Sequence, residues 1–268
     1  MEHWLSLGEL ERLLAMVDIL EPLPPQEVRE LASSCSVSRL NTGETMFVDP
    51  EAHAQRTILL LAGRARVCEE LSHSRTLTVS VAEAGSVVET TGLAPRPQGL
   101  AIEAVIPSVL CFVARENFED LLRRNPEVGL RLLGVLGERI VVLEERLMDL
   151  AHKEVTARLA GTIVRLVDSE GVVTPQCRKI PTSYTHQQLA SMIGSNREST
   201  TRALGRLRDE GLIEVRKRCI HVTDMAGLGR VADEEESRRS DPLLAPIHPT
   251  RSQGKVTERR RLAKVGSR

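Results

Sequence analysis

Aromatic residues are scarce in this chain of 268 residues and make up only 2% of it. Proteins that bind single-stranded nucleic acid need several exposed rings on which bases stack, so the composition argues against that class. The hydrophobic cores must therefore be built from Leu, Val, Ile and Ala. The apolar content of 41% is ordinary for a globular protein, and the length is sufficient for two domains.

Clustered metal ligands are missing as well. The five cysteines are widely spaced, and the sequence has no CxxC pair or Cys/His group. Structural zinc and iron–sulfur clusters therefore have little support, and we expect no metal. No apolar run approaches the roughly eighteen residues that span a membrane, and residues 1–16 show a helical charge pattern instead of a secretory signal. We expect a cytoplasmic protein without membrane contact.

Catalytic motifs are also absent from the sequence, which has no GxSxG, no HExxH and no Walker loop. An enzyme, for example a phosphodiesterase or a kinase-regulatory subunit, is therefore an alternative without positive support. We predict no catalytic residues and no enzymatic activity.

Residues 36–112 have the pattern of many short strands. Leu77, Val79 and Val81 alternate with polar neighbours, which is the period of a half-buried strand. Turn signals such as Asn41-Thr42-Gly43 and Pro95-Arg96-Pro97 recur between such runs. This spacing predicts a β-sandwich or barrel-like roll, flanked by short helices at residues 5–16, 26–32 and 115–123. We assign residues 1–124 to this domain.

A long helix is predicted from Asn125-Pro126 to about residue 150. Its leucines and isoleucine step by three and four residues, which is the heptad spacing of a coiled-coil seam. One face of the helix is expected to pack on its own sheet, but so narrow a stripe needs a partner to cover it. We therefore assign residues 125–151 to dimerisation, through Leu133, Leu136, Ile140, Leu143, Leu147 and Leu150.

The rest of the chain divides into a helical segment and a tail. A further helix at residues 154–169 is out of phase with the seam, which predicts a break near residues 151–154. Residues 229–268 are acidic, then rich in proline and then basic, with few apolar side chains to bury. We expect a disordered tail there, which either adds non-specific attraction to DNA or has no function.

Residues 185–208 have the form of two helices joined by a tight turn. Thr185 and Gln188 fit a capping box, and Gly194 can take the positive φ that ends a helix. Ser195 or Asn196 then caps the second helix. This is helix-turn-helix geometry, and we assign residues 152–228 to it; the alternative is a small helical domain with a charged exterior.

The second of these helices has two distinct faces at 100° per residue. One face is expected to be core: Thr200, Ala203, Leu204 and Leu207. The other carries Glu198, Thr201, Arg202 and Gly205, with Arg197 at its edge. Arginine forks suit guanine and a carboxylate suits the cytosine amino group, so this face is predicted to read bases in the major groove of double-stranded DNA. Thr185 and His186 are expected to face phosphates.

A basic hairpin is predicted directly downstream. Residues 212–215 and 219–222 read as strands around Arg216-Lys217-Arg218, which forms the tip of a wing. Residues 176–223 hold nine Lys/Arg against four Asp/Glu. This local excess suits contact with phosphates, although a solvated basic face is also common.

This order of parts resembles the CRP/FNR family of bacterial transcription regulators over residues 10–228. The matching pieces are residues 41–47, 60–67 and above all 194–204 followed by 207–213. The resemblance implies an α+β fold with an N-terminal β-roll (jelly-roll-like) sensor domain, a long dimerisation helix and a C-terminal winged helix-turn-helix. It also implies a homodimer on near-palindromic promoter sites that contacts RNA polymerase, with activation or repression left open. It places Arg197, Glu198 and Arg202 at base-reading positions and Thr185 and His186 at phosphates; Asn196, Ser199 and Thr201 complete the expected reader.

The sensor half departs from the family pattern. Residues 85–89 carry Glu89, but this stretch is one residue shorter than the corresponding stretch of the family's cyclic-nucleotide site. Leu100 lies where an arginine of that site should neutralise the phosphate of the nucleotide. Leu143 and Glu144 stand where the family contacts adenine. An uncompensated buried phosphate is costly, so we predict that cyclic AMP is not the effector.

Other effectors are left open by the sequence. Cys68 and His73 are candidate haem ligands, but an isolated pair in strand-rich sequence is more often core and surface, and we expect no haem. An unidentified ligand near Glu89, Leu100, Leu143 and Glu144 and control by abundance both remain. A sensor module with a vestigial reader is a third alternative, against which the intact set of Arg197, Glu198 and Arg202 argues.

Overall fold

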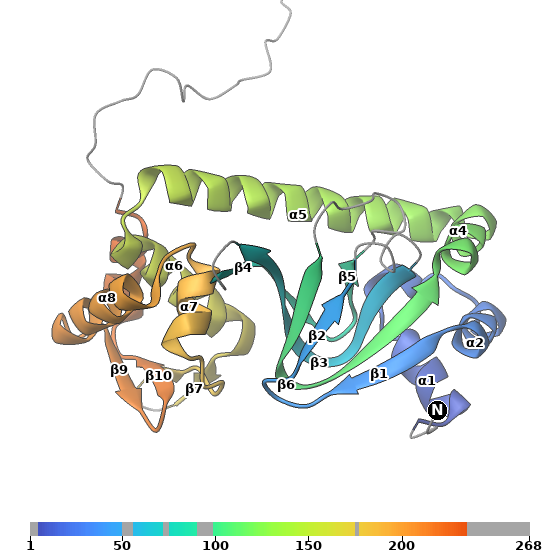
Figure 1. Ribbon diagram of the computed structural model, residues 1–268, viewed down its shortest axis with the longest axis horizontal. Coiled ribbons are helices and arrows are strands. Elements are labelled where there is room, and N and C mark those ends of the chain that lie inside the picture. The colour runs from blue at the N-terminus through green and yellow to red at the C-terminus, as the bar shows by residue number, and fades with distance from the viewer. Residues whose placement is uncertain (1–4, 50–55, 72–74, 90–98, 175–176, 235–268) are drawn as a thin grey trace, which may run out of the picture. The chain divides into compact units, whose positions relative to one another are not determined.

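The computed structural model describes residues 5–49, 56–71, 75–89, 99–174 and 177–234. These residues form helices and two antiparallel sheets, which confirms the α+β class (Figure 1). No helix within these ranges combines the length and the apolarity needed to cross a membrane.

The larger sheet is the predicted β-roll. Its main strand order is β1-β6-β3-β4, with β2 also paired to β6 and β5 to β3. The strands are β1 (Ser36–Leu40), β2 (Thr45–Val48), β3 (Arg56–Leu71), β4 (Arg75–Glu83), β5 (Ser86–Glu89) and β6 (Leu100–Ala114).

Alternating apolar residues of the two long strands form one core of the roll. Ile58, Leu60 and Val67 of β3 pack with Ile102 and Leu110 of β6, and all five are almost completely buried. The pairing of β3 with β6 shifts register around Gly63, which has φ +91°. A Cβ there would lie 2.3 Å from the carbonyl oxygen of Pro107, so this close approach requires glycine.

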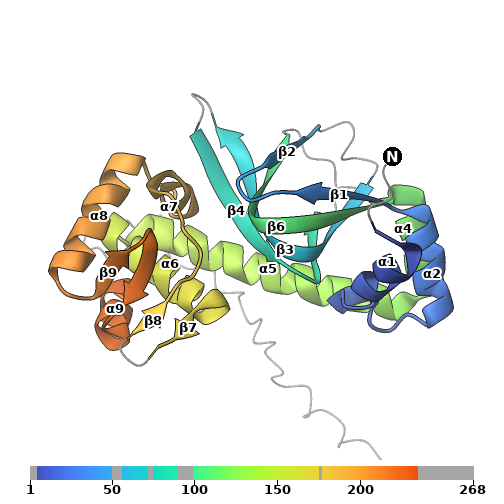
Figure 2. The same ribbon diagram turned by 90° about the horizontal axis from the view of Figure 1, so that it is seen from below.

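Helices cover one end and one side of the roll. A second core joins β3 and β6 to the short helices that cover one end of the roll. Figure 2 shows these helices from below. The helices are α1 (Leu7–Leu14), the 3-10 turn η1 (Asp18–Leu20), α2 (Pro25–Ser34), α4 (Arg115–Arg124) and α5 (Pro126–His152).

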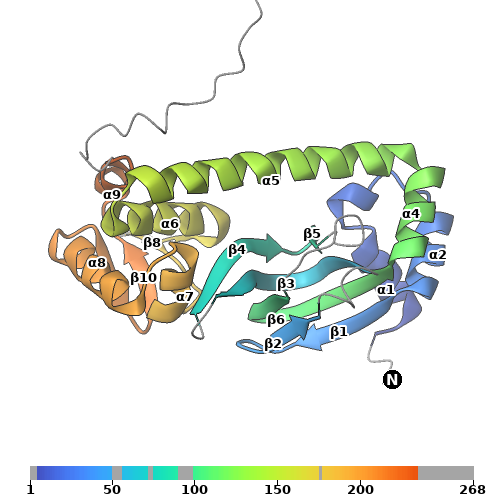
Figure 3. The same ribbon diagram turned by 45° about the horizontal axis from the view of Figure 1, so that its top comes forward.

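The long helix α5 runs beside β4 and β5 and on to the C-terminal helices (Figure 3). Its arginines fix it to the edge of the sheet. Arg139 donates to the carbonyl oxygen of Val88 and to Ser80 Oγ, both at 3.2 Å, and Arg146 donates to the carbonyl oxygen of Val79 at 2.6 Å. These contacts confirm that one face of the long helix packs on the sheet of its own chain, as the sequence predicted.

The C-terminal elements form a winged helix around a core of aliphatic side chains and Tyr184. The small sheet has the order β7-β8-β10-β9. The elements are α6 (Val155–Glu170), β7 (Val172–Val173), β8 (Arg178–Lys179), α7 (His186–Met192), α8 (Arg197–Asp209), β9 (Ile213–Arg216), β10 (Cys219–Val222) and α9 (Met225–Ala232).

The boundary of the tail at residue 228 needs correction. Helix α9 continues to Ala232, is capped by Asp224, and buries Leu228 and Ala232 against α6. Two glycines, Gly227 and Gly229, weakened the helical pattern in the sequence. The remaining residues of the expected tail, 235–268, lie outside the described residues.

Candidate nucleic-acid interface

The helix-turn-helix forms through the local signals seen in the sequence. Thr185 Oγ1 accepts from the Gln188 backbone N–H at 3.1 Å, and Gln188 Oε1 accepts from the Thr185 N–H at 2.8 Å. Gly194 has φ +60° in the turn. Asn196 caps α8 by accepting from the Ser199 N–H at 2.8 Å. The predicted capping box and turn are confirmed, and Asn196, not Ser195, is the cap.

The two faces of α8 are separated as predicted. Thr200, Ala203, Leu204 and Leu207 are buried in the core of the winged helix. Arg197, Glu198, Thr201 and Arg202 are exposed on the opposite side. The outer face therefore presents two guanidinium groups, a carboxylate and a hydroxyl to solvent.

Several of the expected reader residues also have partners within the protein. His186 Nδ1 and Thr201 Oγ1 lie 2.8 Å apart and connect α7 with the outer face of α8. Arg202 Nη2 donates to Ser199 Oγ at 3.1 Å, which orients the guanidinium group. Spacing along one helix could not have indicated the contact between His186 and Thr201, because it depends on the angle between the two helices.

The predicted wing is present, but its first strand lies one residue later than expected, at Ile213–Arg216, so Arg216 belongs to the strand and not to the tip. β9 and β10 pair directly through Cys219 and Arg216, leaving a two-residue turn of Lys217 and Arg218. These two residues have φ values of 50° and 64° and are exposed with Arg216. Arg216 pairs with Glu214 on the same strand, so the free basic charge of the tip comes mainly from Lys217 and Arg218.

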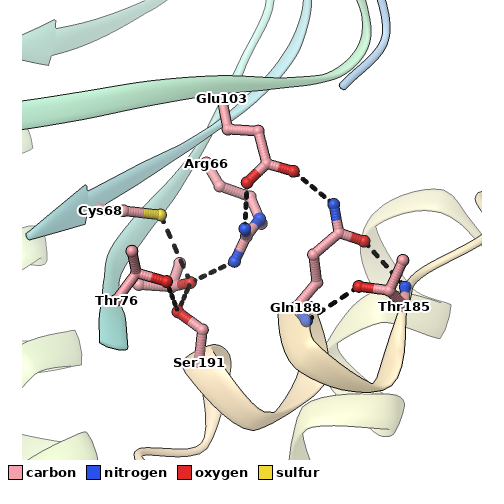
Figure 4. Close-up of polar contacts among 8 residues, drawn as sticks. Arg66, Cys68, Thr76, Glu103, Thr185, Gln188 and Ser191 are labelled. Atoms are coloured by element: carbon pink, nitrogen blue, oxygen red, sulfur yellow. Dashed lines mark hydrogen bonds and ion pairs between the residues drawn. The ribbon is translucent and has the colours of Figure 1, made fainter. Parts of the chain in front are cut away.

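A buried polar network that no sequence motif had indicated joins the roll to α7 (Figure 4). Arg66, with 3% of its side chain exposed, pairs with Glu103 and donates to Thr78 Oγ1 at 2.7 Å. Glu103 in turn accepts from Gln188 Nε2 at 2.5 Å. Thr78 Oγ1 also lies 2.9 Å from Ser191 Oγ. Two residues of α7 are thus held by the sheet.

A second polar group lies where α6 meets the roll. Arg64 pairs with the nearly buried carboxylate of Glu170 at 2.5 Å, and the Tyr184 hydroxyl donates to the same carboxylate at 2.7 Å. Burial and the hydrogen bond to Glu170 raise the pKa of Tyr184. Because both networks connect residues far apart in sequence, no motif could have revealed them.

The residues of the predicted seam are largely exposed in the single chain. Leu133 and Leu147 are 66% and 65% exposed and Ile140 is 57% exposed. Leu143 and Leu150 are also exposed, whereas Leu136 is partly buried against the N-terminal core. An apolar stripe of this length along one helix is a surface that the single chain leaves uncovered.

The residues expected near a ligand lie in different surroundings. Glu89 and Leu100 are buried in the roll, whereas Leu143 and Glu144 are exposed on α5. Of the candidate haem ligands, Cys68 is buried with Sγ 3.8 Å from Thr78 Oγ1, and His73 lies outside the described residues. Within the described ranges, no three potential metal ligands gather in one place.

A winged helix-turn-helix joined through a long helix to a β-roll defines a class, the DNA-binding transcription regulators. The model of the Crp-like helix-turn-helix domain matches residues 157–231. The global nitrogen regulator of Synechocystis sp. is 28% identical over 197 residues, which cover 72% of this chain and 87% of that protein. A CRP-like cAMP-activated global transcriptional regulator of Mycobacterium tuberculosis is 20% identical over 224 residues, covering 83% and 100% of the two chains.

Solved structures with a similar fold include regulators of the same kind. A mutant of CooA from Carboxydothermus hydrogenoformans matches with a TM-score of 0.65 at 20% identity, covering 81% of this chain and 95% of that one. The chain is therefore a CRP-like transcription regulator and is similar to members of the CRP/FNR family, as its sequence motifs predicted.

Proposed function

We propose that the protein is a homodimer that reads near-palindromic promoter sites through α8 and regulates transcription by contacting RNA polymerase. The observation that carries this proposal is the outer face of α8, where Arg197, Glu198 and Arg202 are exposed and Arg202 is oriented by its hydrogen bond to Ser199. Two such helices in a dimer would enter successive major grooves about 34 Å apart. Phosphates would be contacted by Thr185, His186, Lys217 and Arg218.

In vitro selection of bound DNA tests the reader. We expect a two-fold symmetric motif for the wild type, and loss or relaxation at specific base pairs for Arg197→Ala and Glu198→Ala. Removal of one bidentate base contact should cost about 1–3 kcal/mol of discrimination. Arg29→Ala is the matched control, because Arg29 is exposed on α2 and paired with Glu11, far from the reader in sequence. Binding that depends on salt but not on sequence would contradict the proposal.

The exposed leucine stripe of α5 supports the homodimer. An aspartate at Ile140 would place a charge in the seam, so Ile140→Asp should abolish dimerisation and operator binding together. Val141→Asp is the control, since its side chain is also exposed but points about 100° away along the helix. Sedimentation and operator binding are measured on both variants, and operator binding by a monomeric Ile140→Asp would refute the coupling.

Cyclic AMP is not the effector in this proposal. Leu100 supplies no charge for a phosphate, and Leu143 offers no hydrogen bond to adenine. Titration calorimetry with cyclic AMP and cyclic GMP should therefore detect no binding, and micromolar affinity for either would show this part wrong. In vitro transcription from a selected promoter distinguishes activation from repression.

A further inference from the structure

A cavity of about 210 Å³ lies between α5, β4, α6 and the end of α7. We call it the junction cavity. Its walls are mainly aliphatic, and it shares Arg146, Thr162, Arg165 and Met192 with a second cavity of about 170 Å³. The aliphatic part of its wall comprises Leu77, Val79, Leu143, Leu147, Leu150, Met192 and Ile193.

The charged residues of the junction cavity are mostly cationic. Three arginines, Arg146, Arg158 and Arg165, line it beside one carboxylate, Asp149. That carboxylate is already engaged, because Lys153 Nζ lies 2.8 Å from it and Arg165 lies 3.8 Å from it. The cavity therefore has an excess of positive charge against an apolar wall.

Arg146 is the residue of the junction cavity that points most directly to an anionic ligand. Burial, together with the nearby positive charges of Arg165 and Arg139, lowers its pKa, and Asp149 offsets this only in part. Its one described hydrogen bond runs to the carbonyl oxygen of Val79, although a guanidinium group has five donors. Among the described residues, no carboxylate forms an ion pair with Arg146. A partly buried cation of this kind is stabilised by an incoming anion.

We propose that the junction cavity binds a small organic acid, with its carboxylate on Arg146 and Arg165 and its apolar body against Leu77, Val79 and Ile193, which lie outside the dimer seam. The volume is below the roughly 300–1,000 Å³ of drug-sized pockets, which favours a short ligand. The site differs from the one implied by the family resemblance: of Glu89, Leu100, Leu143 and Glu144, it includes only Leu143.

The position of the cavity gives such a ligand a route to the reader. Leu77 and Leu147 belong to the roll and α5, whereas Met192 and Gly194 belong to α7 and the turn before α8. A ligand that contacts both sides changes DNA affinity if its own affinity differs between the free and DNA-bound arrangements. This step rests on the proposed function, but binding to the cavity does not.

Calorimetry with octanoate on the full-length protein tests the site. We expect saturable binding to the wild type, at least tenfold weaker binding to Arg146→Met and to Arg165→Met, and unchanged binding to Arg29→Met. Arg165 is half exposed, so its variant guards against a folding defect in Arg146→Met. The neutral analogue 1-octanol should bind at least tenfold more weakly than octanoate.

Three results would overturn the proposal: no saturable binding of octanoate, wild-type affinity in both arginine variants, or equal binding of 1-octanol. Octanoate binding to monomeric Ile140→Asp but not to the wild type would also overturn it, because that result would mean that a second copy of the chain fills the cavity in the dimer. Saturating octanoate should change operator affinity at least about fivefold. An unchanged operator affinity would refute the coupling to the reader, whereas a protein that binds octanoate but no operator would refute the proposed function alone.

Discussion

Removal of the Glu103 carboxylate is the most direct test of the contact between the roll and α7. Glu103→Ala leaves the Arg66 guanidinium group, of which 3% is exposed, without its ion pair and with the Thr78 hydroxyl as its remaining described partner. Breaking a buried pair costs about 3–5 kcal/mol. Because Glu103 itself is 19% exposed, we expect the lower end, about 3 kcal/mol. This corresponds to roughly a hundredfold change in the unfolding equilibrium.

Urea unfolding followed by circular dichroism measures this loss. Glu83→Ala is the control, because Glu83 is half exposed and its partner Arg64 keeps its pair with Glu170. That variant should lose less than about 1 kcal/mol. The apolar double variant Arg66→Met/Glu103→Leu should recover most of the stability. A loss below about 1 kcal/mol for Glu103→Ala would refute the reasoning, since the pair would then behave as if exposed to solvent.

Three further predictions concern the winged helix. Tyr184 is the single tyrosine of the chain, so in the native protein the absorbance of the ionised phenol should develop at a pH above the ordinary tyrosine pKa of about 10. In urea this titration should move to lower pH. Because the folded-state pKa is raised, the contribution of Tyr184 to stability is present below about pH 10 and is lost as the pH rises through the folded-state pKa. Gly194→Ala should lower the Tm by the equivalent of about 1–2 kcal/mol, because φ is +60° and the new Cβ would meet Leu150 at 2.9 Å. Leu207→Ala should cost about 2–5 kcal/mol in urea unfolding, since Leu207 is completely buried, and an effect below 1 kcal/mol would contradict the packing.

The sequence predicted the local features of the reader and missed the contacts between domains. Capping and the two faces of α8 depend on residues three or four apart, so Thr185, Gln188 and Thr200 could be assigned from spacing alone. The pairs of Arg66 with Glu103 and of Arg64 with Glu170 depend on how the roll and the winged helix approach each other. No periodicity encodes that approach, and the arginines of the junction cavity were hidden for the same reason.

Weak local signals explain the other differences. Strands β7 and β8 have two residues each, which is too short for an alternating pattern to appear. The glycines of α9 lowered its helical propensity, and the burial of Leu228 on α6 outweighs that loss. The break near residues 151–154 was visible because the apolar stripes of α5 and α6 are out of phase.

The backbone of the wing tip shows a conflict between stability and charge. A two-residue hairpin turn with both residues at positive φ is formed most easily by Asn-Gly, yet Lys217 and Arg218 occupy it, each at a cost of about 1 kcal/mol or more. Lys217→Asn/Arg218→Gly should therefore raise the Tm while weakening DNA binding and reducing its dependence on salt. This exposed turn of the winged helix thus keeps two cations in a strained geometry, so replacing them would increase the stability of the protein but remove positive charge from the wing.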